Sequence, residues 1–191
     1  MAHLFPEAVV AASNLADRER ALIRSYRGET PMFAEPDKVA ALLDCVRALD
    51  GEGIAYALIG GLAVGVHSGS PRATIDIDFA AATSCDCGRI VAALERAGFR
   101  QTGRFEHSVN FRHSSGEPLQ VAFDAQFDPM IERAEFFEMR GKSIPIVRKE
   151  DLITMKERAA ADSARRKSKR LRDQADVELL KGDVPDPDEG W

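Results

Sequence analysis

The sequence lacks the features that mark several large classes of protein. Its 191 residues contain only three cysteines, and Cys85 and Cys87 form a C-x-C with no second pair, so neither a disulfide framework nor a zinc site is expected. No apolar run approaches the roughly 20 residues that a membrane span needs. The segment Met1 to Ala12 has no basic lead for a secretory signal. These absences favour a globular protein with reduced thiols and no membrane association, which we expect in the cytoplasm.

Charge is distributed unevenly along the chain. The formal net charge is −5, which argues against a general nucleic-acid binder. The segment 148–172, however, holds ten basic and four acidic side chains, a net charge of +6, which leaves −11 for the remainder. A basic helical region on an acidic body can face phosphate groups, although a solvated helix surface has the same composition.

Apolar periodicity predicts helices interleaved with strands. Strands are expected at 54–59, 75–79, 99–104, 108–113, 119–126 and 142–147. Helices are expected at 6–26, after Pro36, after Gly60, near Ile90, at 150–161 and at 168–181. This order predicts an α/β (mixed α+β) fold, in which helices flank a mixed β-sheet and a helical region follows it.

The same patterns divide the chain into four parts. The length suits one sizeable core rather than several domains. We expect an N-terminal helical extension over residues 1–35 and the α/β core over 36–147. Basic helices are expected over 148–181, and an acidic, flexible tail over 182–191.

The motif Asp76-Ile77-Asp78 lies on one of the predicted strands. Residues two apart on a strand point to the same face, with Cα atoms roughly 6.5–7 Å apart. Two carboxylates so placed suit a pair of divalent cations roughly 3.5–4 Å apart, and magnesium prefers such oxygen ligands. The solvent-exposed face of an amphipathic strand could carry the same residues, so the motif alone does not distinguish a metal site from an exposed strand.

Gly60 and Gly61 supply that context, because they follow a buried strand and open a short apolar helix. Glycine permits close backbone approach, and a helix N-terminus presents unpaired N–H groups to an anion. The glycine turn and the carboxylate strand are the two parts needed to hold a metal-chelated triphosphate. Asp124, placed in the middle of the strand 119–126, is the expected third carboxylate, although a surface acid on an edge strand would look the same.

The run Ile59-Gly60-Gly61-Leu62-Ala63, followed by R-x-T-x-D-I-D at 72–78, resembles the signature of the nucleotidyltransferase (polymerase β-like) superfamily. More narrowly, the chain is similar to AbiEii-type nucleotidyltransferases, several of which are toxins of toxin–antitoxin pairs. That group also has a later lysine and an R-x-K-D-x-x-D motif. Here Lys156 matches the lysine, and R-x-R-D-x-x-D at 170–176 matches the motif with Arg172 in place of its lysine. The resemblance covers about residues 37–180.

The resemblance implies roles for these residues. Asp76, Asp78 and Asp124 would bind two magnesium ions, or manganese, and Asp124 would act as third ligand or general base. The residues that bind the nucleoside triphosphate would be Gly60, Gly61, Arg72, Thr74 and Lys156. Lys156 in particular would neutralise the triphosphate or the departing pyrophosphate.

The implied activity is the metal-dependent transfer of a nucleoside monophosphate from a nucleoside triphosphate to an acceptor hydroxyl. An RNA acceptor, such as tRNA, fits the basic segment and the resemblance to toxins, and a cognate antitoxin is an expected partner. An aminoglycoside-type small molecule and a protein are alternative acceptors, although Leu62 stands where aminoglycoside enzymes usually have tryptophan. The non-enzymatic alternative is a module that binds a nucleotide or a partner, and the intact Gly60, Gly61, Asp76 and Asp78 argue against it.

Overall fold

The computed structural model describes residues 9–11, 14–15, 37–70, 72 and 74–183. Most of the predicted N-terminal extension, its helix at 6–26 and the tail therefore lie outside the described residues. Residues 9–11 and 14–15 are helical, and Val9 is buried in the hydrophobic core.

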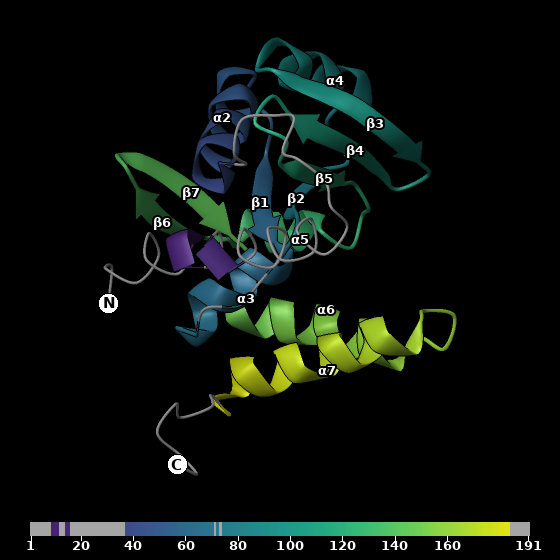
Figure 1. Ribbon diagram of the computed structural model, residues 1–191. Helices are drawn as coiled ribbons and strands as arrows, with labels where there is room; N and C mark the ends of the chain where they lie inside the picture. Colours follow the sequence, from purple (N-terminus) through teal and green to yellow (C-terminus); the bar gives the residue numbers. More distant parts are fainter. Residues whose placement is uncertain (1–8, 12–13, 16–36, 71, 73, 184–191) are drawn as a thin grey trace, which may run out of the picture.

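The strands of the described residues form one seven-stranded sheet in the order β3-β4-β5-β2-β1-β7-β6 (Figure 1). Their bounds are β1 (Tyr56–Ile59), β2 (Ile77–Ala81), β3 (Phe99–Phe105), β4 (Ser108–His113), β5 (Pro118–Ala122), β6 (Glu135–Met139) and β7 (Lys142–Ile146). Neighbouring strands are antiparallel except in the pairs β1–β7 and β2–β5, which are parallel. The predicted mixed sheet is confirmed.

Helices flank the sheet, as expected. They are α2 (Lys38–Gly51), α3 (Gly60–Ser68), α4 (Cys87–Arg96), α5 (Asp128–Glu132), α6 (Lys149–Ala161) and α7 (Lys167–Lys181). In Figure 1, α2 and α4 lie above the central strands and α3 lies below them. Helices α6 and α7 pack against each other and against α3. Within the described residues, no helix is both long and apolar enough to cross a membrane.

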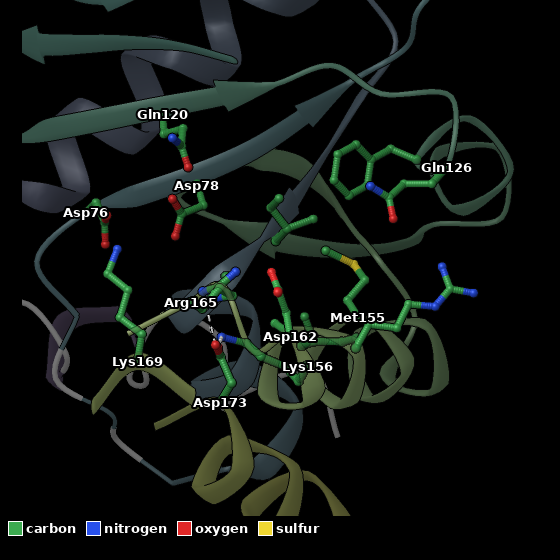
Figure 2. Close-up of a pocket in the computed structure, with 16 residues that line it drawn as sticks. Asp76, Asp78, Gln120, Gln126, Met155, Lys156, Asp162, Arg165, Lys169 and Asp173 are labelled. Carbon is green, nitrogen blue, oxygen red and sulfur yellow. Dashed lines mark hydrogen bonds and ion pairs between the residues drawn. The ribbon is translucent and has the colours of Figure 1, made fainter. Parts of the chain in front are cut away.

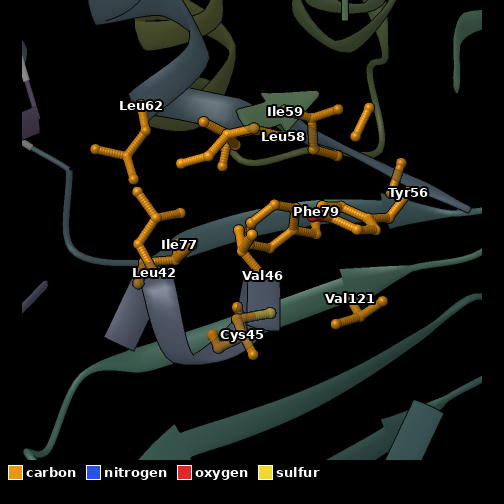
Figure 3. Packing of buried hydrophobic residues seen from close by; sticks show 14 of the residues in the cluster. Leu42, Cys45, Val46, Tyr56, Leu58, Ile59, Leu62, Ile77, Phe79 and Val121 are labelled. Carbon is orange, nitrogen blue, oxygen red and sulfur yellow. The ribbon is translucent and has the colours of Figure 1, made fainter. Parts of the chain in front are cut away.

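The central elements form where the sequence predicts them. Asp37 begins α2, because its side chain accepts a hydrogen bond from the Ala40 N–H at 2.9 Å. All four residues of β1 are buried, as expected for a strand covered on both faces. Figure 3 shows Leu42 of α2 beside Ile77 of β2, and Val46 of α2 beside Phe79 of β2. The two strands that begin and end at the candidate site are therefore anchored in the core.

Some boundaries differ from the sequence predictions. Strand β2 begins at Ile77, and the side chain of Ile75 is 57% exposed, so Ile75 does not share the buried face of Ile77. Strand β5 ends at Ala122, so Asp124 lies in the following turn and its predicted mid-strand position is wrong. Helix α5 and strand β6 were not expected, since α5 has five residues and β6 is a largely exposed edge strand.

Candidate functional site

Two adjoining cavities, of about 450 and 560 Å³, open between the sheet and the helices α6 and α7. Gly60, Asp76 and Asp78 line both of them, so these residues stand where the cavities meet. Figure 2 shows Asp76 and Asp78 among the side chains that line the first cavity. The first cavity has apolar walls from Ile59, Phe127, Leu152 and Met155. The second is lined by Gly61, Arg72, Thr74, Ile75 and Arg172. Lys156, Arg165 and Lys169 reach both cavities from the opposite wall.

The glycine turn lets the two walls of this site approach each other. Gly60 has φ +71°, and a Cβ atom there would lie 2.1 Å from Oδ2 of Asp78. A Cβ atom at Gly61 would lie 2.3 Å from Nη1 of Arg72 and 2.7 Å from Oγ1 of Thr74. Any side chain at these positions would displace the polar groups of the site. The glycines are therefore required by close packing around Asp78 and Arg72, at the N-terminus of α3.

Asp76 and Asp78 form an acidic pair at the start of β2. Asp76 is exposed, Asp78 is half-buried, and the Thr74 hydroxyl lies 3.3 Å from Oδ1 of Asp76. Desolvation by burial and the charge of Asp76 raise the pKa of Asp78 from 3.8 to about 7, against the opposing effect of nearby cations. In the part of the chain that the structure describes, neither carboxylate forms an ion pair. The pair thus presents negative charge that the fold does not neutralise by direct contact.

A second acidic pair, Asp173 and Asp176 of α7, is fully engaged with cations. Nζ of Lys156 lies 2.8 Å from Oδ1 of Asp173 and 2.8 Å from Oδ2 of Asp176. Arg72 also pairs with Asp176, and Arg165 lies 3.1 Å from Asp173. The side chain of Asp176 is only 1% exposed. These contacts join α6, α7 and the segment before β2, and they fix Lys156 and Arg72 at the edge of the cavities.

Other cations of the basic segment remain available to a ligand. Arg158 lines the first cavity, Arg172 lines the second, and Lys169 lines both. Among the described residues, none of these three has an acidic partner within 4.0 Å. The cations of the basic segment that line the cavities are therefore of two kinds. Lys156 and Arg165 are held by Asp173 and Asp176, and the others have no counter-charge among the described residues.

The structure does not bring Asp124 to this site. Asp124 lines neither cavity; its Oδ1 accepts a hydrogen bond from the Gln126 N–H at 2.9 Å, and its Oδ2 lies 3.9 Å from Nδ1 of His107. Within the described ranges, no three His, Cys, Asp or Glu side chains gather as a metal cluster. The structure does bring together Gly60, Gly61, Arg72, Thr74, Asp76, Asp78 and Lys156.

Gln120 occupies the place on β5 where a third carboxylate would face Asp78. The parallel register of β2 and β5 pairs these two residues, and Gln120 lines the first cavity. Its Nε2 donates to Oδ1 of Asn110 at 3.1 Å. Asp162, at the end of α6, also lines the first cavity. Sequence reasoning missed both, because contacts between distant segments decide which residues of β5 and α6 line the cavity that contains Asp78.

Comparisons with known proteins agree with this geometry. The family model described as "Nucleotidyl transferase AbiEii toxin, Type IV TA system" matches residues 41–189, well over half of the chain. No curated protein matches the chain significantly.

Two solved structures are similar in fold. One is the antibiotic-resistance factor ANT(2'')-Ia, with 17% identity and a TM-score of 0.54 over 76% of this chain and 90% of that one. The other is the lincosamide antibiotic adenylyltransferase LnuA bound to lincomycin, with 16% identity and a TM-score of 0.56 over 76% of this chain and 98% of that one. Identities this low show a shared fold alone, whereas the family match extends along most of the chain. The chain belongs to the AbiEii nucleotidyltransferase toxin family.

Proposed function

We propose that this chain is a divalent-metal-dependent enzyme that transfers a nucleoside monophosphate from a nucleoside triphosphate to a hydroxyl of RNA. The observation that carries the proposal is the position of Asp76 and Asp78, where two cavities meet opposite a wall of cations. Nucleotidyl transfer depends mainly on positioning and on neutralising charge, and the cavities supply groups for both.

The residues at this point fit a divalent cation, and magnesium is the metal we propose. Asp76 and Asp78 offer hard oxygen ligands, and the raised pKa of Asp78 reflects burial beside Asp76, an arrangement that favours a bound cation. Two ions held by these carboxylates would neutralise the phosphates and make the acceptor hydroxyl easier to deprotonate. The side-chain oxygen of Gln120, which lines the first cavity, is a further candidate ligand for a cation.

The triphosphate is proposed to bind in the second cavity. Gly60 and Gly61 begin α3, so the N–H groups of its first turn are available to phosphate oxygens. Arg72 and Thr74 line the same cavity. Lys156 contributes its charge from a fixed position, since Asp173 and Asp176 hold its ammonium group. This arrangement favours electrostatic stabilisation by Lys156 over movement with the departing pyrophosphate.

RNA is the acceptor that the cavity walls favour. Arg158, Lys169 and Arg172 face the cavities and have no acidic partner among the described residues, so they suit polyanionic ligands, both the triphosphate in the second cavity and an RNA acceptor. Membership of a toxin family also implies an antitoxin partner. These unpaired cations would attract an anionic acceptor, whereas an uncharged acceptor would not use them.

The test is the transfer of label from each α-labelled nucleoside triphosphate to total tRNA in the presence of magnesium. We expect labelled tRNA with the wild type and none with the Asp76→Ala/Asp78→Ala variant, whose fold is checked by circular dichroism. Magnesium-dependent triphosphate binding without labelled RNA would redirect the search to small-molecule or protein acceptors. The absence of any triphosphate binding would leave only a partner-binding module with this fold.

A further inference from the structure

A fully buried ion pair lies outside both cavities. Nζ of Lys38, the first residue of α2, is 2.6 Å from Oε2 of Glu117, in the turn that precedes β5, and both side chains are 0% exposed. The two residues are 79 positions apart in the sequence. The pair lines neither cavity, so the proposed chemistry does not use it directly.

Lys38 makes a further contact with the segment that carries the acidic pair. Its Nζ donates a hydrogen bond to the backbone carbonyl of Ile75 at 2.9 Å. Ile75 precedes Asp76, and both lie before the start of β2, whose pairing with β5 begins at Ile77. The ammonium group therefore holds the backbone at a point that the described strand ladders do not reach. Thr74 supports the same segment through its contact with Asp76.

Stability alone does not account for this arrangement. Removing two charges from water costs more free energy than their attraction commonly returns, and apolar replacements of similar volume are often neutral or stabilising. Removing one partner is different, because it takes a counter-charge away from a buried ion. A buried pair that also holds a backbone carbonyl beside the candidate metal ligands has a positional role that apolar residues could not fill.

We propose that Lys38 and Glu117 are positioning residues, which fix the backbone at Ile75 and thereby keep the Asp76 carboxylate in place beside Asp78. Glu117 orients and neutralises the ammonium group of Lys38, and the ammonium group holds the carbonyl. The effect on turnover depends on the proposed nucleotidyl transfer, whereas the effect on the backbone does not.

The test uses the full chain with Lys38→Met and Glu117→Leu combined, because either change alone would leave a buried charge. We expect this variant to melt at or above the wild-type temperature. Amide hydrogen exchange of residues 75–78 should be faster, and binding of Mn²⁺, followed by electron paramagnetic resonance, should be weaker. Turnover should fall by about 10²-fold with little change in KM for the triphosphate, since displaced catalytic groups act on the chemical step.

Two further variants complete the experiment. Glu52→Gln/Arg96→Gln removes an exposed ion pair of 2.5 Å that lines neither cavity, and it should leave exchange at 75–78 and turnover unchanged. Glu117→Gln leaves Lys38 a hydrogen-bond acceptor, and its exchange at 75–78 should lie between those of the wild type and the double variant. This milder change decides the case if the double variant does not fold.

A folded double variant with wild-type exchange at residues 75–78 and wild-type Mn²⁺ binding would overturn the positioning role. If the wild type transfers no label to any acceptor, the proposed function fails by itself. The exchange measurement would then still decide whether Lys38 and Glu117 hold this segment.

Discussion

Two acidic pairs lie on elements that enclose the cavities, one at β2 and one on α7, and their surroundings are opposite. Asp76 and Asp78, at the start of β2, have no ion pair among the described residues, and burial raises the pKa of Asp78 to about 7. Asp173 and Asp176, on α7, are tied to Lys156, Arg72 and Arg165. Four residues of one type thus divide into a pair with no counter-ion among the described residues and a pair that already has its cations.

The difference separates a ligand site from a structural network. A carboxylate that the fold has paired gains little from a metal ion, because binding would first have to break its ion pairs. A buried carboxylate without a partner gains most. The network on α7 has a different effect: it holds Lys156 and Arg72 at fixed points near the pair on β2, so the two acidic pairs act together in the proposed site.

The largest effect is expected at Asp173 and Asp176, the pair that is already bound to cations. Asp176→Asn would remove one carboxylate from Arg72 and one of the two that hold Lys156. The side chain of Asp176 is only 1% exposed. We expect the free energy of unfolding to fall by about 3 kcal/mol, measured by urea denaturation. Glu157→Gln, which removes the exposed pair with Lys181, is the control and should change stability by less than about 0.5 kcal/mol. Equal effects of the two variants would contradict a structural role for Asp176.

The next effect is a change of stability with pH, and it concerns Asp78, which has no ion pair among the described residues. The pKa of Asp78 is raised from 3.8 to about 7 in the folded state. Between pH 3.8 and 7, therefore, the Asp78 carboxyl keeps its proton in the folded state and has lost it in the unfolded state. Without metal, wild-type stability should therefore fall relative to Asp78→Asn as the pH rises from 5 to 7, by up to about 2 kcal/mol, and then level off. Urea denaturation in EDTA measures this difference. A difference that grows with pH in favour of the wild type would reverse the assigned direction of the shift.

Unpaired cations on the opposite wall should affect binding rather than stability. Lys169→Gln/Arg172→Gln removes two charges that face the cavities, and we expect triphosphate affinity to weaken about tenfold, or about 1.4 kcal/mol. Isothermal titration calorimetry with magnesium present measures the change. Lys149→Gln/Lys167→Gln alters the net charge equally at residues that line neither cavity, so it is the matched control. Similar losses in both variants would mean that overall charge, rather than position, governs affinity.

The smallest effect is expected at Asp124. This residue lies in the turn after β5 and lines neither cavity, so Asp124→Asn should change turnover by less than about threefold, which is less than about 0.7 kcal/mol. Label transfer under the conditions used for the wild type measures it. A loss of several orders of magnitude would show that Asp124 reaches the reacting groups after all and would restore the sequence prediction.

Much of the fold could be predicted from local patterns. The periodicity after Pro36, the fully apolar strand before Gly60 and the two C-terminal helices all appear within a few residues of their expected places. These elements have strong patterns because each buries one or both of its faces. The mixed sheet and the acidic motif beside the glycine turn followed from the same reasoning and from the family resemblance.

Features that depend on contacts between distant segments could not be predicted. The position of Gln120 beside Asp78 is set by the parallel register of β2 and β5. The pair Lys38–Glu117 joins the start of a helix to a turn far along the chain. A lysine beside a helix cap is normally exposed to solvent, so its burial could not be predicted. Strand β6 escaped prediction because its Phe136 side chain is 71% exposed, as an edge strand allows.

The glycine turn also has a consequence for how this sequence can change. Gly61 is restricted by space, because its φ is ordinary and the atoms nearest to its missing Cβ atom belong to Arg72 and Thr74. Smaller residues at 72 and 74 could relieve that restriction, so second-site suppressors of Gly61→Ala should exist. Gly60 is restricted by both its φ of +71° and the Asp78 carboxylate, and no single compensating substitution removes both. In a library that varies residues 60, 61, 72 and 74 under selection for a folded protein, position 61 should therefore diversify while Gly60 stays fixed.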